Sequence, residues 1–210
     1  RDNDFVKFLK IVANKFSRFY IFVIRGTPMM VQSLIFYYAI FNLFKRTGMS
    51  VTEINRVWSL FISGLVTVSL NSTAYLAEVL RGGILAVDAG QMEAARSLGM
   101  THWQAMRRVV FPQAIKNSLP AIGNEFIINI KDSSVLCVLG VSDLMFMTRS
   151  VAGIYYKGTE CYLIAATVYL FLTYLSSLLL KAITGRMTAP DNTKRRQGNQ
   201  TVDLGLPSSN

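Results

Sequence analysis

Four stretches of the sequence are long and apolar enough to cross a lipid bilayer as helices, and they restrict the possible folds more than any other feature. They cover residues 28–44, 57–80, 119–141 and 161–182. A helix needs roughly 20 residues to cross a hydrocarbon core about 30 Å thick. The last stretch offers only hydroxyls and small groups among its apolar residues, whereas a helix in a soluble core usually carries a polar stripe. With 51% hydrophobic and 16% charged residues, the chain is predicted to be an all-α integral membrane protein.

The distribution of the basic residues decides what the net charge of +10 means. If all four stretches cross, three regions share one side of the membrane: the residues before the first span, the insert between the second and third spans, and the tail. These regions hold most of the Lys and Arg, while the opposite loops hold only Lys45, Arg46, Arg56, Arg149 and Lys157. Cytoplasmic loops of membrane proteins carry an excess of Lys and Arg. The charge therefore predicts that the insert and the tail are cytoplasmic, and it predicts no nucleic-acid partner.

The two ends of the chain are predicted to differ. Residues 1–25 mix apolar residues with Lys and Arg at helical spacing, as an interfacial or loop helix does, and Thr27 is expected to cap the first span. Because the chain begins at Arg1 without an initiator Met or a signal peptide, we expect a further span upstream. Residues 188–210 have no apolar period and are rich in Pro, Gly, Asn and Ser, which predicts a disordered cytoplasmic tail. The transmembrane domain is therefore assigned to residues 1–187.

A polar insert at about residues 88–118 separates the second and third apolar stretches. The good helix formers Met92–Leu98 predict a short helix, which Gly99 can end in the left-handed conformation. The following "THWQ" is a capping-box pattern that starts a second helix, and Pro112 is expected to interrupt that helix. Small residues in the first helix would let a partner approach closely. The insert is thus either a docking element or an ordinary surface loop.

The insert also resembles the EAA loop of bacterial ABC importer permeases, usually written EAA…G…I-x-L-P. The matching positions are Glu93, Ala94, Ala95, Gly99, Val109, Phe111 and Pro112, where Val and Phe replace the commoner Ile and Leu and keep an apolar face. Further motifs are similar to the polar amino acid uptake permeases, over about residues 20–182. They are "RGTP" at 25–28, "AYLAEVLRGGI" at 74–84, "GQMEAARSLG" at 90–99, "LPAIGNE" at 119–125 and "KDSS" at 131–134.

This resemblance implies a type I importer fold, commonly with five spans, of which four lie in this chain and the first would lie upstream. It implies two permease subunits, identical or related, on two ATPase subunits in the bacterial inner membrane. A solute-binding protein would deliver a polar amino acid or similar small polar solute from outside, and transport would proceed by alternating access. The residues implied to couple the spans to the ATPase are Glu93, Ala94, Ala95, Gly99 and Pro112.

No enzyme site or metal site is expected in this chain. The sequence lacks a GxxxxGK[ST] motif, so ATP and Mg²⁺ are expected on the partner ATPase and no cofactor on this chain. It also lacks a nucleophile elbow and an HExxH helix. His102 is the only histidine, and Cys137 and Cys161 are expected to be free thiols.

Polar side chains within the predicted spans are the candidate substrate-path residues. An uncompensated charge near the bilayer centre costs on the order of 3 kcal/mol, so these groups should face protein or water. At 100° per residue, those of the third span gather on one side of the helix. The candidates are Asn71, Glu78, Asn124, Glu125, Lys131, Asp132 and Ser133. The alternative for the third span is pairing between groups or subunits at the cytoplasmic mouth, and the alternative for the second span is helix packing.

Two other classes of function stay open from these residues. In a stand-alone channel or secondary transporter, Glu125, Lys131 and Asp132 would serve as ion or proton sites. In a membrane anchor, the insert would merely recruit a cytoplasmic protein.

Overall fold

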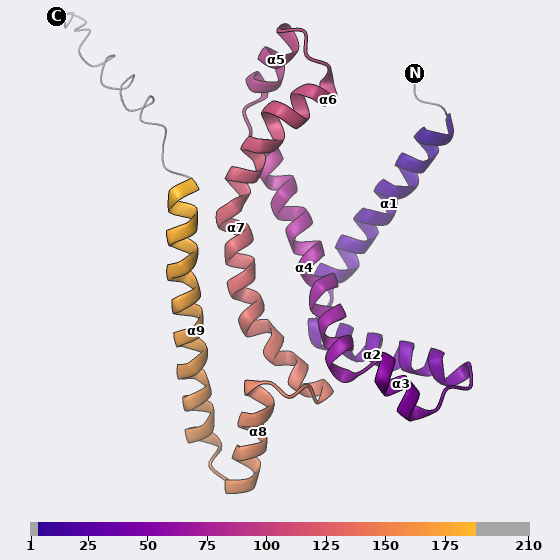
Figure 1. Cartoon of the computed structure of the whole chain (residues 1–210), viewed down its shortest axis with the longest axis vertical. Coiled ribbons are helices and arrows are strands. Elements are labelled where there is room, and N and C mark those ends of the chain that lie inside the picture. Colours follow the sequence, from indigo (N-terminus) through magenta and orange to yellow (C-terminus); the bar gives the residue numbers. More distant parts are fainter. Residues whose placement is uncertain (1–3, 188–210) are drawn as a thin grey trace, which may run out of the picture.

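The computed structural model describes residues 4–187, which form helices joined by short turns with no β-strand among them (Figure 1). The predicted all-α fold class is confirmed, and the predicted tail lies outside the described residues. In chain order the helices are α1 (Asp4–Gly26), α2 (Met29–Arg46), α3 (Val51–Val57), α4 (Leu60–Leu85), α5 (Ala89–Ser97), α6 (His102–Ala105), the π-helix η1 (Met106–Val110), α7 (Phe111–Asp132), the 3₁₀-helix η2 (Ser133–Leu139), α8 (Leu144–Tyr155) and α9 (Gly158–Met187).

Helix α7 lies between α4 and α9 and packs against both, with α9 at one edge of the molecule (Figure 1). α4 runs toward the end where α5 and α6 lie, α7 runs back from that end, and α9 runs toward it again. α3 and α8 lie at the opposite end, and α1 and α2 diverge from the side of α4. The insert is therefore carried between the ends of two neighbouring helices.

The number of possible membrane spans agrees with the four apolar stretches of the sequence. Among the described residues, α4 and α9 are each long and apolar enough to cross a membrane. Two bent pairs also pass this test when each pair is taken together: Val6–Gly26 with Met29–Arg46, bent by 113°, and His102–Leu139 with Leu144–Tyr155, bent by 52°. The described part of the chain thus holds up to four spans, and the exact span limits stay a prediction.

Local capping residues divide the second apolar stretch, which was predicted as one helix from residue 57. Ser50 and Glu53 form a capping box that starts the short helix α3. Ser59 then caps α4 by accepting a hydrogen bond from the Ile62 N–H (3.2 Å). The membrane-length helix therefore begins at Leu60 and extends beyond the predicted end to Leu85.

The third apolar stretch, predicted as a span over 119–141, is also not one helix. α7 ends at Asp132, and the chain continues as the tighter helix η2 to a left-handed Gly140 (φ 91°). Asp143 then accepts a hydrogen bond from the Phe146 N–H (2.7 Å) and starts α8, a helix that was not predicted.

A sharp bend separates α1 from α2, and the predicted capping role of Thr27 is wrong. α2 has Pro28 as its N-cap residue and no side-chain cap. The Thr27 hydroxyl instead donates to the Val23 carbonyl (2.8 Å), in the last turn of α1. Because Pro28 has no N–H, it cannot continue the hydrogen bonds of α1, and the chain turns there.

Glycine allows the close approach of α4 to α7. A methyl group at Gly83 would overlap Ser118 Oγ and lie 2.7 Å from the Ala114 carbonyl oxygen. The side chain of Ser118 is buried, and its hydroxyl lies 3.4 Å from the Val79 carbonyl oxygen. The two helices that carry the insert are therefore in backbone-to-backbone contact just before they reach it.

Candidate coupling and transport site

The first helix of the insert, α5, begins at Ala89, three residues before the predicted start at Met92, and ends at Gly99 as the sequence predicts. Asp88 caps it through a hydrogen bond from the Gly90 N–H (2.7 Å). At its end, the Met100 N–H bonds to the Ala95 carbonyl (3.2 Å) and the Gly99 N–H to the Arg96 carbonyl (3.0 Å). With Gly99 at φ 82°, this is a Schellman ending, in which the left-handed residue is normally glycine. The role of Gly99 as a helix terminator is confirmed.

The second helix of the insert starts at the predicted capping box. The Thr101 hydroxyl accepts from the Gln104 N–H, and the Gln104 side chain accepts from the Thr101 N–H (2.9 Å). The prediction that Pro112 interrupts this helix is wrong, because helical backbone continues from α6 through η1 into α7.

The π-helical turn explains why Pro112 is tolerated. In an α-helix, the proline ring would clash with the carbonyl four residues earlier. The wider turn Met106–Val110 displaces that carbonyl, and the Phe111 N–H reaches the Met106 carbonyl instead. The side chain of Gln113 stabilises this turn. Its Nε2 donates to the Val109 carbonyl (3.0 Å) and to Oε1 of Gln91 in α5 (3.2 Å). The insert is therefore joined to α7 by continuous helix.

Neighbouring motif residues of the insert differ in their solvent exposure. Glu93 and Ala94 are exposed, whereas Ala95 is only 4% exposed. α5 packs against α6 and η1, so Ala95 supports the insert from inside. Leu98 and Trp103 are 81% and 70% exposed, which is high for large apolar side chains. The insert, which lies at one end of the molecule (Figure 1), thus exposes both a carboxylate and large apolar side chains.

The candidate path residues of α7 lie toward the end of that helix away from the insert. Glu125 and Ser133 are half-buried, whereas Asn124, Lys131 and Asp132 are exposed. Lys131 and Asp132 occupy the last turn of α7, and Ser133 is its C-cap residue. The alternative, in which these groups pair with each other or with the second subunit at the cytoplasmic mouth, stays a prediction.

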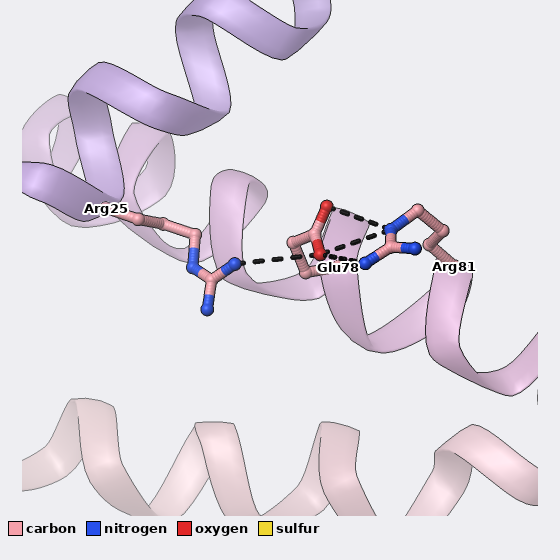
Figure 2. A network of polar contacts seen from close by, with 3 residues as sticks. All are labelled: Arg25, Glu78 and Arg81. Atoms are coloured by element: carbon pink, nitrogen blue, oxygen red, sulfur yellow. Dashed lines mark hydrogen bonds and ion pairs between the residues drawn. The ribbon is translucent and has the colours of Figure 1, made fainter.

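The two candidates in α4 have protein partners. The Asn71 side chain is buried and donates to Gln32 Oε1 of α2 (3.1 Å). Figure 2 shows Glu78 between two arginines. Arg81 bonds it through Nε (3.1 and 3.2 Å) and Nη2 (2.7 Å), while Arg25 Nη1 lies 3.7 Å away. The guanidinium of Arg25 also lies 5.2 Å from the centre of the Tyr75 ring, within cation–π range.

Sequence reasoning missed Gln32, Arg25 and Arg81 as members of these clusters. The Glu78–Arg81 pair could have been found, because residues three apart face each other on a helix. The contacts of Gln32 and Arg25 depend on the bend between α1 and α2, which brings residues 39 and 53 positions apart into contact.

The end opposite the insert is hollowed, and the described part of the chain contains no candidate metal centre. Two open cavities of about 470 Å³ lie there, the first lined by η2 and α8 and the second by α2, α3, α4 and the turn after η2. Within the described residues, no group of three or more His, Cys, Asp or Glu side chains could hold a metal ion.

Over the described residues the chain is helical, with two membrane-length apolar helices and two bent pairs that also pass this test, an exposed helical insert at one end and cavities at the other, which is the architecture of a multi-pass membrane protein. Residues 7–189 match the family model of the binding-protein-dependent transport system inner membrane component. The chain belongs to this family.

Curated relatives and a solved structure agree with this assignment. The chain is 37% identical over 182 residues to the probable amino-acid permease protein YxeN of Bacillus subtilis (87% of this chain, 78% of the relative). It is 34% identical over 176 residues to the glutamine transport system permease protein GlnP of Escherichia coli K12 (84% and 76%). A crystal structure of an amino acid ABC transporter with histidines matches with a TM-score of 0.71 and 44% identity (86% and 78%).

These findings confirm several predictions made from the sequence. The chain is a transmembrane permease subunit of an ABC importer with the type I fold, a multi-pass protein of the inner membrane. Such subunits are not catalytic, and they work with a separate ATPase and a binding protein. The comparisons favour this class over a stand-alone channel or an ion-coupled transporter.

Proposed function

We propose that this permease moves a polar amino acid or a similar small polar solute into the cell, and that its insert couples this movement to ATP hydrolysis. The observation that carries the coupling role is the exposed α5–α6 insert, which a short turn joins to α4 and continuous helix joins to α7. The solute class is supported by the names of the relatives, which include glutamine and amino-acid permeases.

The proposed contact with the ATPase uses the exposed motif residues. Glu93 and Ala94 lie on the surface of α5, and Leu98 and Trp103 are the exposed apolar side chains of the insert. Gly99 fixes the angle between the two insert helices, and Pro112 follows the π-helical turn. Ala95 is buried and would support α5 from the side that packs against α6 and η1. ATP and Mg²⁺ would be held by the ATPase, and this chain would bind no cofactor.

The proposed assembly has two permease subunits, identical or related, on two ATPases. The insert and the tail would be cytoplasmic, as the excess of Lys and Arg favours. The solute-binding protein would then dock at the opposite end, where the two cavities open. As the ATPases close on ATP, the insert would move and the helices would rock between states with different affinity for the solute.

The proposed substrate path follows the polar groups of α4 and α7. Glu78 and Glu125 provide carboxylates for the ammonium group of the solute, and Lys131 provides a cation for its carboxylate. Asn124, Asp132 and Ser133 lie beside these groups on α7, and Asn71 lies at the edge of the path on α4. Lys131→Ala and Asp132→Ala should each lower uptake while the complex still assembles. Unchanged uptake in both variants would remove α7 from the path.

ATPase activity of the complete complex in proteoliposomes tests the coupling role. The activity is measured with and without solute-loaded binding protein, in the wild type and in Glu93→Arg. The variant should assemble but lose most of the solute-stimulated hydrolysis, because the reversed charge lies on the proposed contact. Glu160→Arg, the same reversal at an exposed glutamate of α9, is the control for assembly with the ATPase. Full stimulation in Glu93→Arg would show that the insert does not transmit the signal.

A further inference from the structure

Gln32 closes the bend between α1 and α2. Its Nε2 donates to the carbonyls of Ile24 (2.7 Å) and Thr27 (2.9 Å) and to the Thr27 hydroxyl (2.8 Å). In a continuous helix, the N–H of residue 28 would bond to the Ile24 carbonyl, but proline has no N–H. The Gln32 amide replaces this missing donor, and the side chain is only 5% exposed. The bend is therefore held by one buried side chain.

The same side chain connects the bend to α4. Its Oε1 accepts a hydrogen bond from Nδ2 of Asn71 (3.1 Å), and both residues are buried. A buried polar group without a partner is costly, so this pair cannot separate without penalty. The Gln32–Asn71 contact thus joins three helices: α1 through its carbonyls, α2 through the glutamine backbone, and α4 through the asparagine.

Other contacts of the bend fall on the same face of α4. Asn71, Tyr75 and Glu78 follow the spacing i, i+4, i+7, which places them on one side of a helix. Arg25, in the last turn of α1, lies against the second and third of these residues. The Arg25–Glu78 pair is long (3.7 Å) and partly exposed, so it stabilises little. The buried amide pair is therefore the stronger of the two connections.

The position of this pair links the two ends of the molecule. α4 ends at Leu85 and only three residues separate it from α5, so any displacement of the insert acts directly on α4. α2 runs sideways from the bend (Figure 1) and packs against η2, which lines one of the cavities at the opposite end. The contacts form a continuous series from the insert through α4, the amide pair and α2 to η2.

We propose that Gln32 and Asn71 form the joint through which movement of the coupling insert reaches α2 and the opposite end of the permease. When α4 shifts, the amide pair makes the bend follow, and α2 changes its position against η2. Gln32 and Asn71 are thus positioning residues for alternating access. This inference rests on the proposed coupling role of the insert.

The test variant is Asn71→Thr, which removes the link to Gln32 while leaving α4 able to fold. The hydroxyls of Thr67, Ser69 and Thr73 all bond to the carbonyl four residues earlier in α4, so a threonine at position 71 can do the same. Asn71→Gln keeps an amide donor and serves as the conservative variant. Thr67→Val is the matched control, because this buried hydroxyl bonds only within its own helix. Asn71→Leu is the second link-removing variant.

The measurement is the ratio of solute-stimulated to basal ATP hydrolysis in proteoliposomes, with solute uptake per ATP. In Asn71→Thr the ratio should fall roughly 2- to 30-fold, the range expected for loss of a coupling contact. Asn71→Gln should recover most of it, and Thr67→Val should keep it. A purely structural role would lower the amount of assembled complex without changing the ratio.

The outcomes separate this inference from the coupling proposal on which it rests. If Glu93→Arg loses stimulation but Asn71→Thr keeps it, the joint is refuted and the coupling role of the insert stands. If Asn71→Gln loses as much as Asn71→Thr, the hydrogen bond is not the transmitting contact. If neither Asn71→Thr nor Asn71→Leu assembles, Asn71 is required for folding and the joint is also refuted. If Glu93→Arg keeps full stimulation, the coupling proposal itself fails.

Discussion

The contact between α4 and α7 can be tested with two adjacent glycines of α4. A methyl group at Gly83 would overlap Ser118 Oγ and approach the Ala114 carbonyl oxygen to 2.7 Å, whereas nothing lies within 4 Å of the same group at Gly82. A serine hydroxyl can rotate away, but a carbonyl in the middle of α7 cannot. Gly83→Ala must therefore push α4 and α7 apart, while Gly82→Ala needs no adjustment.

The expected magnitude follows from comparing the two variants. Both gain the helix propensity of alanine over glycine, about 1 kcal/mol, and this gain cancels in the comparison. Gly83→Ala also carries the cost of overpacking, typically about 1–3 kcal/mol. For a chain of this size, 1 kcal/mol corresponds to roughly 2–4 °C in the melting temperature. Gly83→Ala should therefore melt several degrees below Gly82→Ala.

The assay is the thermal unfolding of the purified complex in detergent, followed by size-exclusion chromatography after heating, together with ATPase stimulation in proteoliposomes. Stimulation should also fall in Gly83→Ala, because the lost contact lies between the two helices that carry the insert. Equal melting temperatures for the two variants would refute the close approach of α4 and α7. A lower melting temperature with normal stimulation would confirm the packing but show that it does not affect coupling.

Three further predictions concern the turns and caps. Gly99→Ala should destabilise the insert by about 1 kcal/mol, because a side chain resists the left-handed conformation at φ 82°. Gly99→Asn should cost less. The affinity of each permease variant for the ATPase subunit, compared with the wild type, tests this order. The Ser50 N–H, and to a smaller extent the Ser50 hydroxyl, donate hydrogen bonds to Glu53 and lower the pKa of its carboxyl group. The cap therefore stabilises the fold fully above the ordinary glutamate pKa. This stabilisation is lost as the pH falls through the lowered pKa. Melting temperatures measured down to acidic pH should show this loss in the wild type and not in Glu53→Gln. Pro112→Ala should let the π-helical turn relax to an α-helix and rotate α6 about α7, which would weaken ATPase binding; unchanged binding would show that the turn does not set the orientation of the insert.

Local patterns in the sequence predicted much of the fold, because their physical causes are also local. The Gly99 ending and the Thr101 capping box depend on hydrogen bonds within a few residues, and both are found as predicted. The effect of Pro112 was mispredicted because a proline rule for α-helices does not consider the wider π turn. α8 was missed because its capping residue, Asp143, follows an irregular segment rather than a recognisable helix start.

The clusters between helices could not be predicted in the same way. Gln32 is an unremarkable residue of an apolar stretch until the bend at Pro28 places its amide over the end of α1. Asn71 and Glu78 were recognised as costly polar groups within a span, but their partners lie on other elements or one turn away. Sequence therefore identified which polar groups need compensation, and only the three-dimensional arrangement showed what compensates them.

The two kinds of helix contact found here suggest how movement is divided within the permease. At Gly83 and Ser118 the backbones of α4 and α7 are in direct contact, which leaves little freedom for one helix to slide along the other. These two helices should therefore move together when the insert is displaced. The bend of α1 and α2 instead meets α4 through side-chain polar contacts, from Gln32 to Asn71, from Arg25 to Glu78 and from the Tyr20 hydroxyl to the Leu70 carbonyl, and such contacts can pivot more readily than a backbone contact. Motion should then concentrate at the bend, so that α2 changes its angle to the α4–α7 pair while that pair moves as a rigid body.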